Sequence, residues 1–495
     1  MQDSFLIIAM ETSEAKKNYK HILKYTSVFG GVQGLNILVG VVRNKLVALI
    51  LGPDGMGLIS LFNSTIKLVS DSSNLGINMS GVRSVSEAFE KGDEDALRQT
   101  IATVRAWSLV CALAGMLLCI VLSPLLNRWT FTWGDHTLHF VLLSPTIAML
   151  AITCGELAIM KGTRQLKALA KVSIIHVVGV LLITVPIYYF YGEAGIVPSL
   201  MISALIQMLL VIGFSRYKTR IITRFNLSLL KSGLGMLKLG IAFVLAGIFG
   251  SGADFLIRTY LNNVADLSVV GLFNAGYMMT MVYAGMVFSA METDYFPRLS
   301  AVQNDVVLQN DTVNKQIEVS LLLLSPLLVA FSVFLPIILP LLYSGKFLPA
   351  LGMMQVMVMA MYLRAIKLPM AYLPLAKGDS RSYLLLEFIY DVVVVALVCL
   401  LYSRFGLTGC GIGITLTALL DFIVLSCYTN HKYGYVISSD VWRYMFLLLP
   451  FGLLAFALTF VGNQLIYWML GVALIAVCSF VVYNIYKVKM RGGVA

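Results

Sequence analysis

The chain has 495 residues, of which 59% are hydrophobic and only 12% are charged, and its mean hydropathy is +0.86. Soluble globular proteins carry about 25% charged residues, so this composition excludes a soluble domain and indicates a polytopic membrane protein. The formal net charge of +11 does not indicate nucleic-acid binding, because the excess lies in loops on one predicted side of the membrane.

The amino terminus argues against a cleaved signal peptide, and the cysteines argue against disulfides and metal sites. Residues 1–23 contain one short apolar patch followed by Glu11 and Glu14. They lack the basic region and the long apolar core of a cleaved signal peptide, so we expect a cytoplasmic lead-in. The seven cysteines lie in apolar stretches without CxxC spacing, which predicts neither a disulfide framework nor a metal site.

The apolar stretches predict an all-α integral membrane protein with about 14 transmembrane helices. A helix needs about 20 mostly apolar residues to span a bilayer. In chain order the predicted spans are 25–50, 57–81, 100–124, 138–160, 172–191, 195–215, 236–260, 267–290, 318–343, 350–373, 383–403, 407–428, 443–461 and 464–486.

Basic residues in the loops predict the orientation. Nearly all of them fall on one side, for example within 16–24, 83–98, 161–171 and 216–231. The opposite side has only Arg128, Lys346 and Arg404. By the positive-inside rule, and with an even number of spans, both termini are predicted to be cytoplasmic.

The two halves of the chain resemble each other at an offset of about 215 residues. The matching positions are Arg43, Gly57-Leu58 and Arg83 with Arg258, Gly271-Leu272 and Arg298; Lys161-Gly162-Thr163-Arg164 with Lys377-Gly378-Asp379-Ser380-Arg381; His176 with Asp391; and Gly192-x-x-Gly195 with Gly406-x-x-Gly409. An even number of spans per repeat predicts two parallel six-helix lobes around a central cavity, at 24–224 and 225–430. Residues 431–495 add two helices and a cytoplasmic tail.

Polar residues recur on single faces of three predicted spans. Gln33, Asn36, Gly40 and Arg43 share a face of the first span, and Lys67, Asp71, Asn74 and Asn78 share a face of the second; Ser251, Asp254 and Arg258 do so in the seventh. Lys67/Asp71 and Asp254/Arg258 are opposite charges four residues apart, so they can pair locally.

Arg43 and Lys45 have no such local partner, which leaves a cationic excess in the amino-terminal lobe. A charge at membrane depth is expensive and usually faces the interior of a bundle or a wet cavity. The alternative is that both side chains extend to the outer interface, because Gly52-Pro53 is only about ten residues away. The two local pairs could likewise be purely structural.

The other ionisable residues inside spans are Glu156, His176, Glu387, Asp391 and Asp421. Such groups suit proton or sodium coupling, because their charge can differ between two conformations. Residues near span ends could instead face lipid head groups, and we expect Arg364 and Lys367 to do so. No Walker sequence or soluble-enzyme motif is present, so the chain is predicted not to be an enzyme.

The run Arg43-Asn-Lys45-Leu-Val-Ala-Leu-Ile-Leu-Gly52-Pro53-x-Gly55-x-Gly57-Leu58 resembles the first-helix signature of Wzx-type flippases. These form the polysaccharide-transporter branch of the multidrug/oligosaccharidyl-lipid/polysaccharide (MOP) exporter superfamily. Lys161-Gly162 and Lys377-Gly378, each opening a loop between equivalent helices, resemble that family too. The similarity extends over about residues 24–430.

The resemblance implies two lobes that alternate between inward-open and outward-open states in the bacterial inner membrane. It implies a substrate of undecaprenyl pyrophosphate carrying an O-antigen, enterobacterial-common-antigen (lipid III) or capsule repeat unit, with a glycan polymerase and chain-length proteins as partners. No cofactor is implied besides a coupling proton or sodium ion. By analogy with lipid II flippases, residues 443–486 would flank a groove for the lipid tail.

A pyrophosphate is a compact anion, which Arg or Lys can neutralise in a low-dielectric cavity. We expect substrate contacts from Arg43, Lys45, Lys67, Arg258, Asn36 and Asn74, and ion coupling at Asp71, Asp254, Asp391 and His176.

Three other functions compete with this interpretation. A MATE-like proton- or sodium-coupled drug exporter shares the superfamily, but such proteins tend to carry an acid in the first helix, and none lies between Tyr25 and Leu51. A membrane glycan polymerase or ligase usually needs a large external loop, which is absent here. A scaffold without transport leaves the buried charges unexplained.

Overall fold

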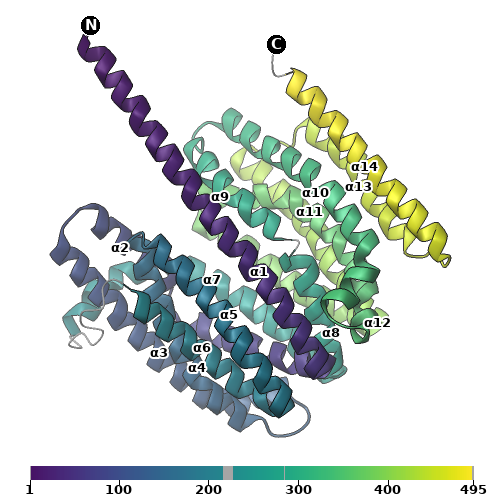
Figure 1. The fold of residues 1–495 in the computed structure, drawn as a ribbon, viewed down its shortest axis with the longest axis horizontal. Helices are drawn as coiled ribbons and strands as arrows, with labels where there is room; N and C mark the ends of the chain where they lie inside the picture. Colours follow the sequence, from purple (N-terminus) through teal and green to yellow (C-terminus); the bar gives the residue numbers. More distant parts are fainter. Residues whose placement is uncertain (1, 216–226, 284, 493–495) are drawn as a thin grey trace. The chain divides into compact units, whose positions relative to one another are not determined.

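The computed structural model describes residues 2–215, 227–283 and 285–492, and every regular element within them is helical (Figure 1). The α-helices are α1 (Gln2–Ser73), α2 (Ile77–Glu90), α3 (Glu94–Thr130), α4 (Thr137–Gly162), α5 (Leu166–Tyr191), α6 (Ile196–Phe214), α7 (Leu227–Val264), α8 (Leu267–Tyr277), α9 (Met286–Ala301), α10 (Val306–Leu342), α11 (Leu351–Ala376), α12 (Ser380–Tyr433), α13 (Ser439–Leu458) and α14 (Gln464–Gly492). Short 3₁₀ turns lie at Gly192–Gly195 and Gly345–Ala350, and a π-helical turn lies at Met278–Tyr283.

The all-helical membrane fold that the sequence predicts is confirmed. Among the described residues, ten stretches are long and apolar enough to cross a membrane. Three of them, Gly34–Ser73, Leu166–Phe214 and Ser380–Tyr433, each cover two predicted spans. The predicted span 267–290 is divided among α8, the π-helical turn and α9. The predicted lead-in at 1–23 is helical from Gln2 onward and continuous with the first span.

The chain divides into two compact units. Unit 1 comprises residues 1–50, 69–124 and 136–241, and unit 2 comprises residues 51–68, 125–135 and 242–495. The lobe boundaries predicted from the sequence, 24–224 and 225–430 followed by 431–495, stay a prediction.

Glycines interrupt the long helices at equivalent points of the repeat. Gly192 (φ 55°, ψ −134°) separates α5 from the following turn, and Gly406 (φ 58°, ψ −144°) breaks α12. A residue with a Cβ adopts this backbone region only under strain. A Cβ at Gly409 would also lie 2.0 Å from the carbonyl oxygen of Leu401. The repeated Gly-x-x-Gly motif therefore reverses the chain in the same way in both halves.

The loops α4–α5 and α11–α12 form the same hydrogen-bonded turn. The Gln165 amide donates to the Met160 carbonyl (2.9 Å), and the Asp379 amide donates to the Pro374 carbonyl (2.8 Å). Arg164 and Gly378 both have positive φ, 54° and 69°. The left-handed residue defines this turn, so Arg164 and Gly378 are structurally equivalent. The sequence repeat instead pairs Gly162 with Gly378, two residues away from the structural match.

The predicted span 57–81 is not one continuous helix, which corrects part of the expected polar stripe. Leu75 (φ 47°) and Gly76 (φ 76°) adopt left-handed conformations between α1 and α2. Two such residues in succession break the helical hydrogen-bond pattern. Asn78 consequently belongs to α2 and does not continue the face that carries Lys67 and Asp71.

Gly52 (φ 67°, ψ −167°) interrupts α1. Within unit 2, the part of α1 that follows Gly52 crosses α8 with the backbones almost in contact. A Cβ at Gly57 would lie 2.0 Å from the Leu267 carbonyl oxygen, and a Cβ at Gly271 would lie 1.9 Å from the Pro53 carbonyl oxygen. Small residues permit such close packing of membrane helices. Gly57 and Gly271 are also equivalent in the sequence repeat, so the two copies of one motif pack on each other.

The last two helices pack against α10 and α11 of unit 2 (Figure 1). Gly452 of α13 lies on the ring of Tyr362, and Gly471 of α14 lies on Val333. Cys478 and Ala455 are buried against Val329. The connection between α12 and α13 is held by Asn314, whose amide donates to the Val436 carbonyl (3.0 Å) and whose oxygen accepts from the Tyr435 hydroxyl (2.9 Å).

A polar network fastens the two ends of α12 to each other. The Asp379 carboxylate accepts from the Lys432 ammonium (2.6 Å), the Ser382 hydroxyl (2.7 Å) and the Tyr433 hydroxyl (2.9 Å). The hydrogen bond from Lys432 holds the pKa of Asp379 well below its ordinary value. The ionised carboxylate therefore stabilises the turn between α11 and α12.

Alanine at Gly57 or Gly271 is expected to lower stability by about 1–3 kcal/mol, because the added methyl group meets a backbone carbonyl that cannot move aside. Thermal unfolding of the purified protein in detergent measures this. Gly247→Ala is the matched control, since a Cβ there meets nothing within 4 Å. Equal melting temperatures for all three variants would contradict the close crossing.

Asp379→Asn is expected to destabilise the protein at pH 7, and its difference from wild type should shrink as the pH falls below about 4. The sign follows from the lowered pKa: the stabilisation is complete above the pKa of the unfolded carboxyl group and is lost as pH falls through the folded value. Unfolding measured between pH 3 and pH 8 checks this. Asp311→Asn, which removes an exposed pair with Lys315, should change little at any pH.

Candidate functional site

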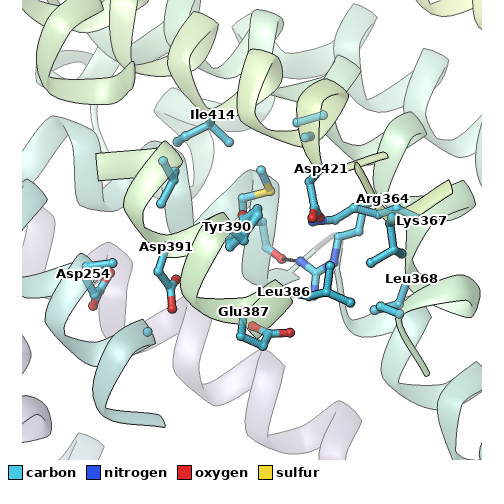
Figure 2. Close-up of a pocket in the computed structure, with 18 of the residues that line it drawn as sticks. Asp254, Arg364, Lys367, Leu368, Leu386, Glu387, Tyr390, Asp391, Ile414 and Asp421 are labelled. Atoms are coloured by element: carbon cyan, nitrogen blue, oxygen red, sulfur yellow. Dashed lines mark hydrogen bonds and ion pairs between the residues drawn. The ribbon is translucent and has the colours of Figure 1, made fainter. Parts of the chain in front are cut away.

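Unit 2 contains a cavity of about 280 Å³ whose walls carry six charged side chains from the described residues. It is lined by α7, α8, α11 and both parts of α12. Figure 2 shows Asp254, Asp391 and Glu387 on one side of the cavity and Arg364, Lys367 and Asp421 on the other. The remaining polar liners are Tyr277, Tyr383 and Tyr390.

The helix geometry explains how these groups come together. Glu387 and Asp391 are four residues apart on α12, and Arg364 and Lys367 are three apart on α11, so each pair shares one helix face. Asp421 comes from the second part of α12, after the break at Gly406. The break at Gly406 reverses the direction of the chain, so the two segments of α12 line the same cavity.

The predicted pair of Asp254 and Arg258 is present. The two side chains form an ion pair on α7, and Arg258 is only 5% exposed. The guanidinium also donates to the Ser60 hydroxyl (2.7 Å) and to the Asn274 side-chain oxygen (3.3 Å). Arg258 is therefore held by three partners, while Asp254 lines the cavity.

Arg364 and Lys367, which we expected at the membrane interface, line this cavity instead. Lys367 forms an ion pair with Asp421, and its ammonium lies 4.1 Å from the centre of the Tyr390 ring. Arg364 stacks over Phe288 and donates to the Met281 carbonyl (3.3 Å). The pair of Lys367 and Asp421 could have been predicted from the sequence, because Asp421 is an acid inside an apolar span and such an acid requires a partner.

Asp391 differs from these paired groups. It is 9% exposed, and among the described residues its Oδ2 atom has no hydrogen-bond partner. A buried carboxylate oxygen without a partner carries a large desolvation penalty. It lines the cavity, so a proton or another ligand from the cavity can satisfy it.

Unit 1 brings together a second set of predicted residues, on α1 and α5. The Asn36 amide donates to the Ser173 hydroxyl (2.7 Å), and Arg43 lies close enough to His176 and Tyr188 for its charge to act on both. Among the described residues, Arg43 Nε, Asn36 Oδ1 and His176 Nε2 are buried without a hydrogen-bond partner. Sequence spacing predicted the face of Asn36 and Arg43, but not its pairing with α5.

The other predicted site residues occupy different surroundings. The Asn74 amide donates to Cys154 Sγ (3.4 Å), and Lys67 is exposed. Lys45 and Asp71 are half-buried, and each has an interaction partner.

A buried ion pair of unit 1 was not predicted. Arg105 of α3 donates to Glu156 of α4 through two nitrogens, at 2.5 and 3.0 Å, and the two side chains are 7% and 4% exposed. Such a bidentate pair is geometrically specific. It neutralises Glu156 and connects α3 with α4.

The fold is that of the MOP superfamily transporters. A lipid II flippase, MurJ, in an inward closed conformation aligns over 93% of this chain and 99% of its own, with a TM-score of 0.70 and 12% identity. An inward-facing multidrug resistance MATE family transporter of the MOP superfamily aligns over 81% and 94%, with a TM-score of 0.69 and 15% identity. A MOP superfamily transporter from Pyrococcus furiosus, described by the reverse polarity of its binding pocket, aligns over 82% and 95%, with a TM-score of 0.57 and 13% identity.

The class defined by the fold and the membrane-spanning helices is thus that of multi-pass membrane proteins. Within it, the chain belongs to the polysaccharide biosynthesis protein family, whose sequence profile matches residues 46–351. The comparison with curated proteins gives no match.

Glu156→Gln is expected to destabilise the protein by about 3–5 kcal/mol, because it leaves the Arg105 charge buried and uncompensated. The double variant Arg105→Met/Glu156→Leu should recover most of that loss. The melting temperatures of both, measured in one detergent, test this. A double variant less stable than Glu156→Gln would contradict the account.

Proposed function

We propose that this protein is a flippase that moves an undecaprenyl-pyrophosphate-linked oligosaccharide from the cytoplasmic to the outer leaflet of the bacterial inner membrane. The oligosaccharide would be an O-antigen, enterobacterial-common-antigen or capsule repeat unit. Two lobes, 24–224 and 225–430, would alternate access to the site, with both termini in the cytoplasm. A glycan polymerase and chain-length proteins would act on the exported product.

Two findings support this class of substrate. The chain belongs to the polysaccharide biosynthesis protein family, and its fold is similar to that of a flippase whose name specifies lipid II, a lipid-linked molecule. The alignment covers 93% of this chain, so it extends into residues 431–495. We assign α13 and α14 to the lipid tail.

The proposal depends chiefly on the surroundings of Arg43. The side chain is half-buried in a membrane-spanning helix, its Nε has no partner among the described residues, and no acid lies between Tyr25 and Leu51. A guanidinium in such a position is suited to bind a pyrophosphate with two parallel hydrogen bonds. Asn36 and His176 lie in the same cluster, and Lys45, Lys67, Asn74 and Arg258 are further candidates for substrate contact.

Ion coupling would involve carboxylates whose charge differs between the two conformations. Asp391 is the best supported, because it is buried beside a cavity with one oxygen atom unpartnered among the described residues. Asp254, Asp71 and His176 are the other candidates. Either a proton or a sodium ion could serve in principle.

The alternative is a MATE-like proton- or sodium-coupled drug exporter. Solved MATE transporters have the same fold, and the carboxylates of the unit 2 cavity could receive a cationic compound. The cationic cluster around Arg43 favours an anionic substrate instead. Drug sensitivity of a deletion strain separates the two, since only the exporter predicts increased toxicity.

Deletion of the protein is expected to cause accumulation of an undecaprenyl-linked glycan on the cytoplasmic side. Mass spectrometry of extracted lipid-linked glycans detects it, and complementation should remove it. Normal surface glycan with no accumulated intermediate, together with greater drug sensitivity, would refute the flippase.

Arg43→Ala, in a stably inserted protein, is expected to reduce glycan export about tenfold or more, because it removes a charge-assisted contact to the pyrophosphate. Arg43→Lys should restore part of the loss. Arg128→Ala, at an exposed arginine in the last turn of α3, is the control and should export normally. Intact export by Arg43→Ala would refute the role of Arg43.

A further inference from the structure

We propose that the unit 2 cavity binds a proton and excludes sodium: Glu387 and Asp391 share the proton, and the Lys367 ammonium occupies the position that a metal ion would take. The proposed function assumes a coupling ion, and this inference rests on that assumption alone when it names the ion. It adds Glu387, Lys367 and Asp421 to the residues that act in transport.

The first argument is the balance of charges around the cavity. Four carboxylates face it: Asp254, Glu387, Asp391 and Asp421. Three cations oppose them. Arg258 pairs with Asp254, Lys367 pairs with Asp421, and Arg364 lines the wall. One negative charge remains, and it falls on the face of α12 that carries Glu387 and Asp391.

The remaining charged and titratable neighbours do not change this balance. Lys67 of α1 acts on Asp391 electrostatically, but it neither lines the cavity nor forms one of the ion pairs described above. Tyr277 of α8 and Tyr383 and Tyr390 of α12 also line the cavity, and neutral phenols leave the count unchanged. A single proton shared by two adjacent carboxylates therefore makes the cavity neutral.

The second argument is the supply of oxygen ligands. Sodium, a hard cation, prefers several oxygen ligands, as calcium does. The lining residues include no serine, threonine, asparagine or glutamine, and beyond the charged groups and tyrosines they are glycine and apolar side chains. Two of the four carboxylates are already occupied by Arg258 and Lys367. Within the described part of the chain, no group of three or more metal-binding side chains is close enough to hold a metal.

The third argument is the position of Lys367. Its ammonium contacts Asp421 and the Tyr390 ring, and its charge also acts on Glu387 and Asp391. A cation tethered among three carboxylates repels a second cation in a low-dielectric cavity. A proton is different, because it forms a covalent O–H bond on one carboxylate and needs no coordination shell.

The proton uptake of the full-length protein in detergent tests the first half of the proposal. Titration of an unbuffered sample from pH 8 to pH 5 should show that wild type binds about one proton more than the double variant Glu387→Gln/Asp391→Asn. An equal number of protons bound by the two proteins would overturn the proton site.

Sodium dependence of thermal stability tests the second half. In sodium chloride and choline chloride at equal ionic strength, wild type should melt at the same temperature. Lys367→Gln, which removes the tethered cation and adds a neutral oxygen, should gain a sodium-specific upward shift. Lys346→Gln, at an exposed lysine outside the cavity, should behave as wild type.

A sodium-specific shift in wild type that disappears in Asp391→Asn would overturn the proposal. A Lys367→Gln variant without any sodium-specific shift would overturn the role of Lys367. None of these measurements requires the glycan. A deletion strain that accumulates no glycan would refute the flippase but would not affect the proton site. Equal proton uptake by wild type and the double variant would refute the proton site but would not affect the flippase.

Discussion

The structure depends on how a charged side chain is neutralised where water is absent. An isolated charge in the membrane interior is costly, and a pair is tolerated only with good geometry and further hydrogen bonds. Arg105 with Glu156, Arg258 with Asp254, and Lys367 with Asp421 satisfy this requirement. Arg43 and Asp391 each leave one buried polar atom without a partner among the described residues. These two positions are where we place the chemistry.

The two compact units use these charges differently. In unit 1 the cluster on α1 and α5 has Arg43 as its charged member, which suits an anion. In unit 2 the cavity is rich in carboxylates, and its three cations are held by partners or stacked on aromatic rings. If the cluster binds an anionic substrate and the cavity binds a proton, as we propose, the two binding events act on different contacts.

Sequence patterns predicted the helical membrane fold because hydrophobic length alone decides whether a segment can cross a bilayer. They also identified the repeat, since Gly192 and Gly406 break their helices with the same backbone geometry. The pair of Asp254 and Arg258 was predictable because both members lie on one helix. Pairs between helices, such as Arg105 with Glu156, depend on which helices are neighbours, and spacing along the chain contains no information on that. The break at Leu75 was missed because leucine normally favours a continuous helix.

The crossing of α1 and α8 is stabilised by contacts between backbone atoms. At each glycine, a hydrogen atom takes the direction of the absent Cβ and points at a carbonyl oxygen of the other helix: Gly57 toward Leu267 and Gly271 toward Pro53. Such Cα–H···O contacts contribute about 0.5–1 kcal/mol each. Because donor and acceptor are both backbone atoms, this reciprocal pair does not depend on the identity of the side chains around it. The two helices are thus joined by a contact that substitutions at neighbouring positions leave intact, and that any residue larger than glycine at either position removes.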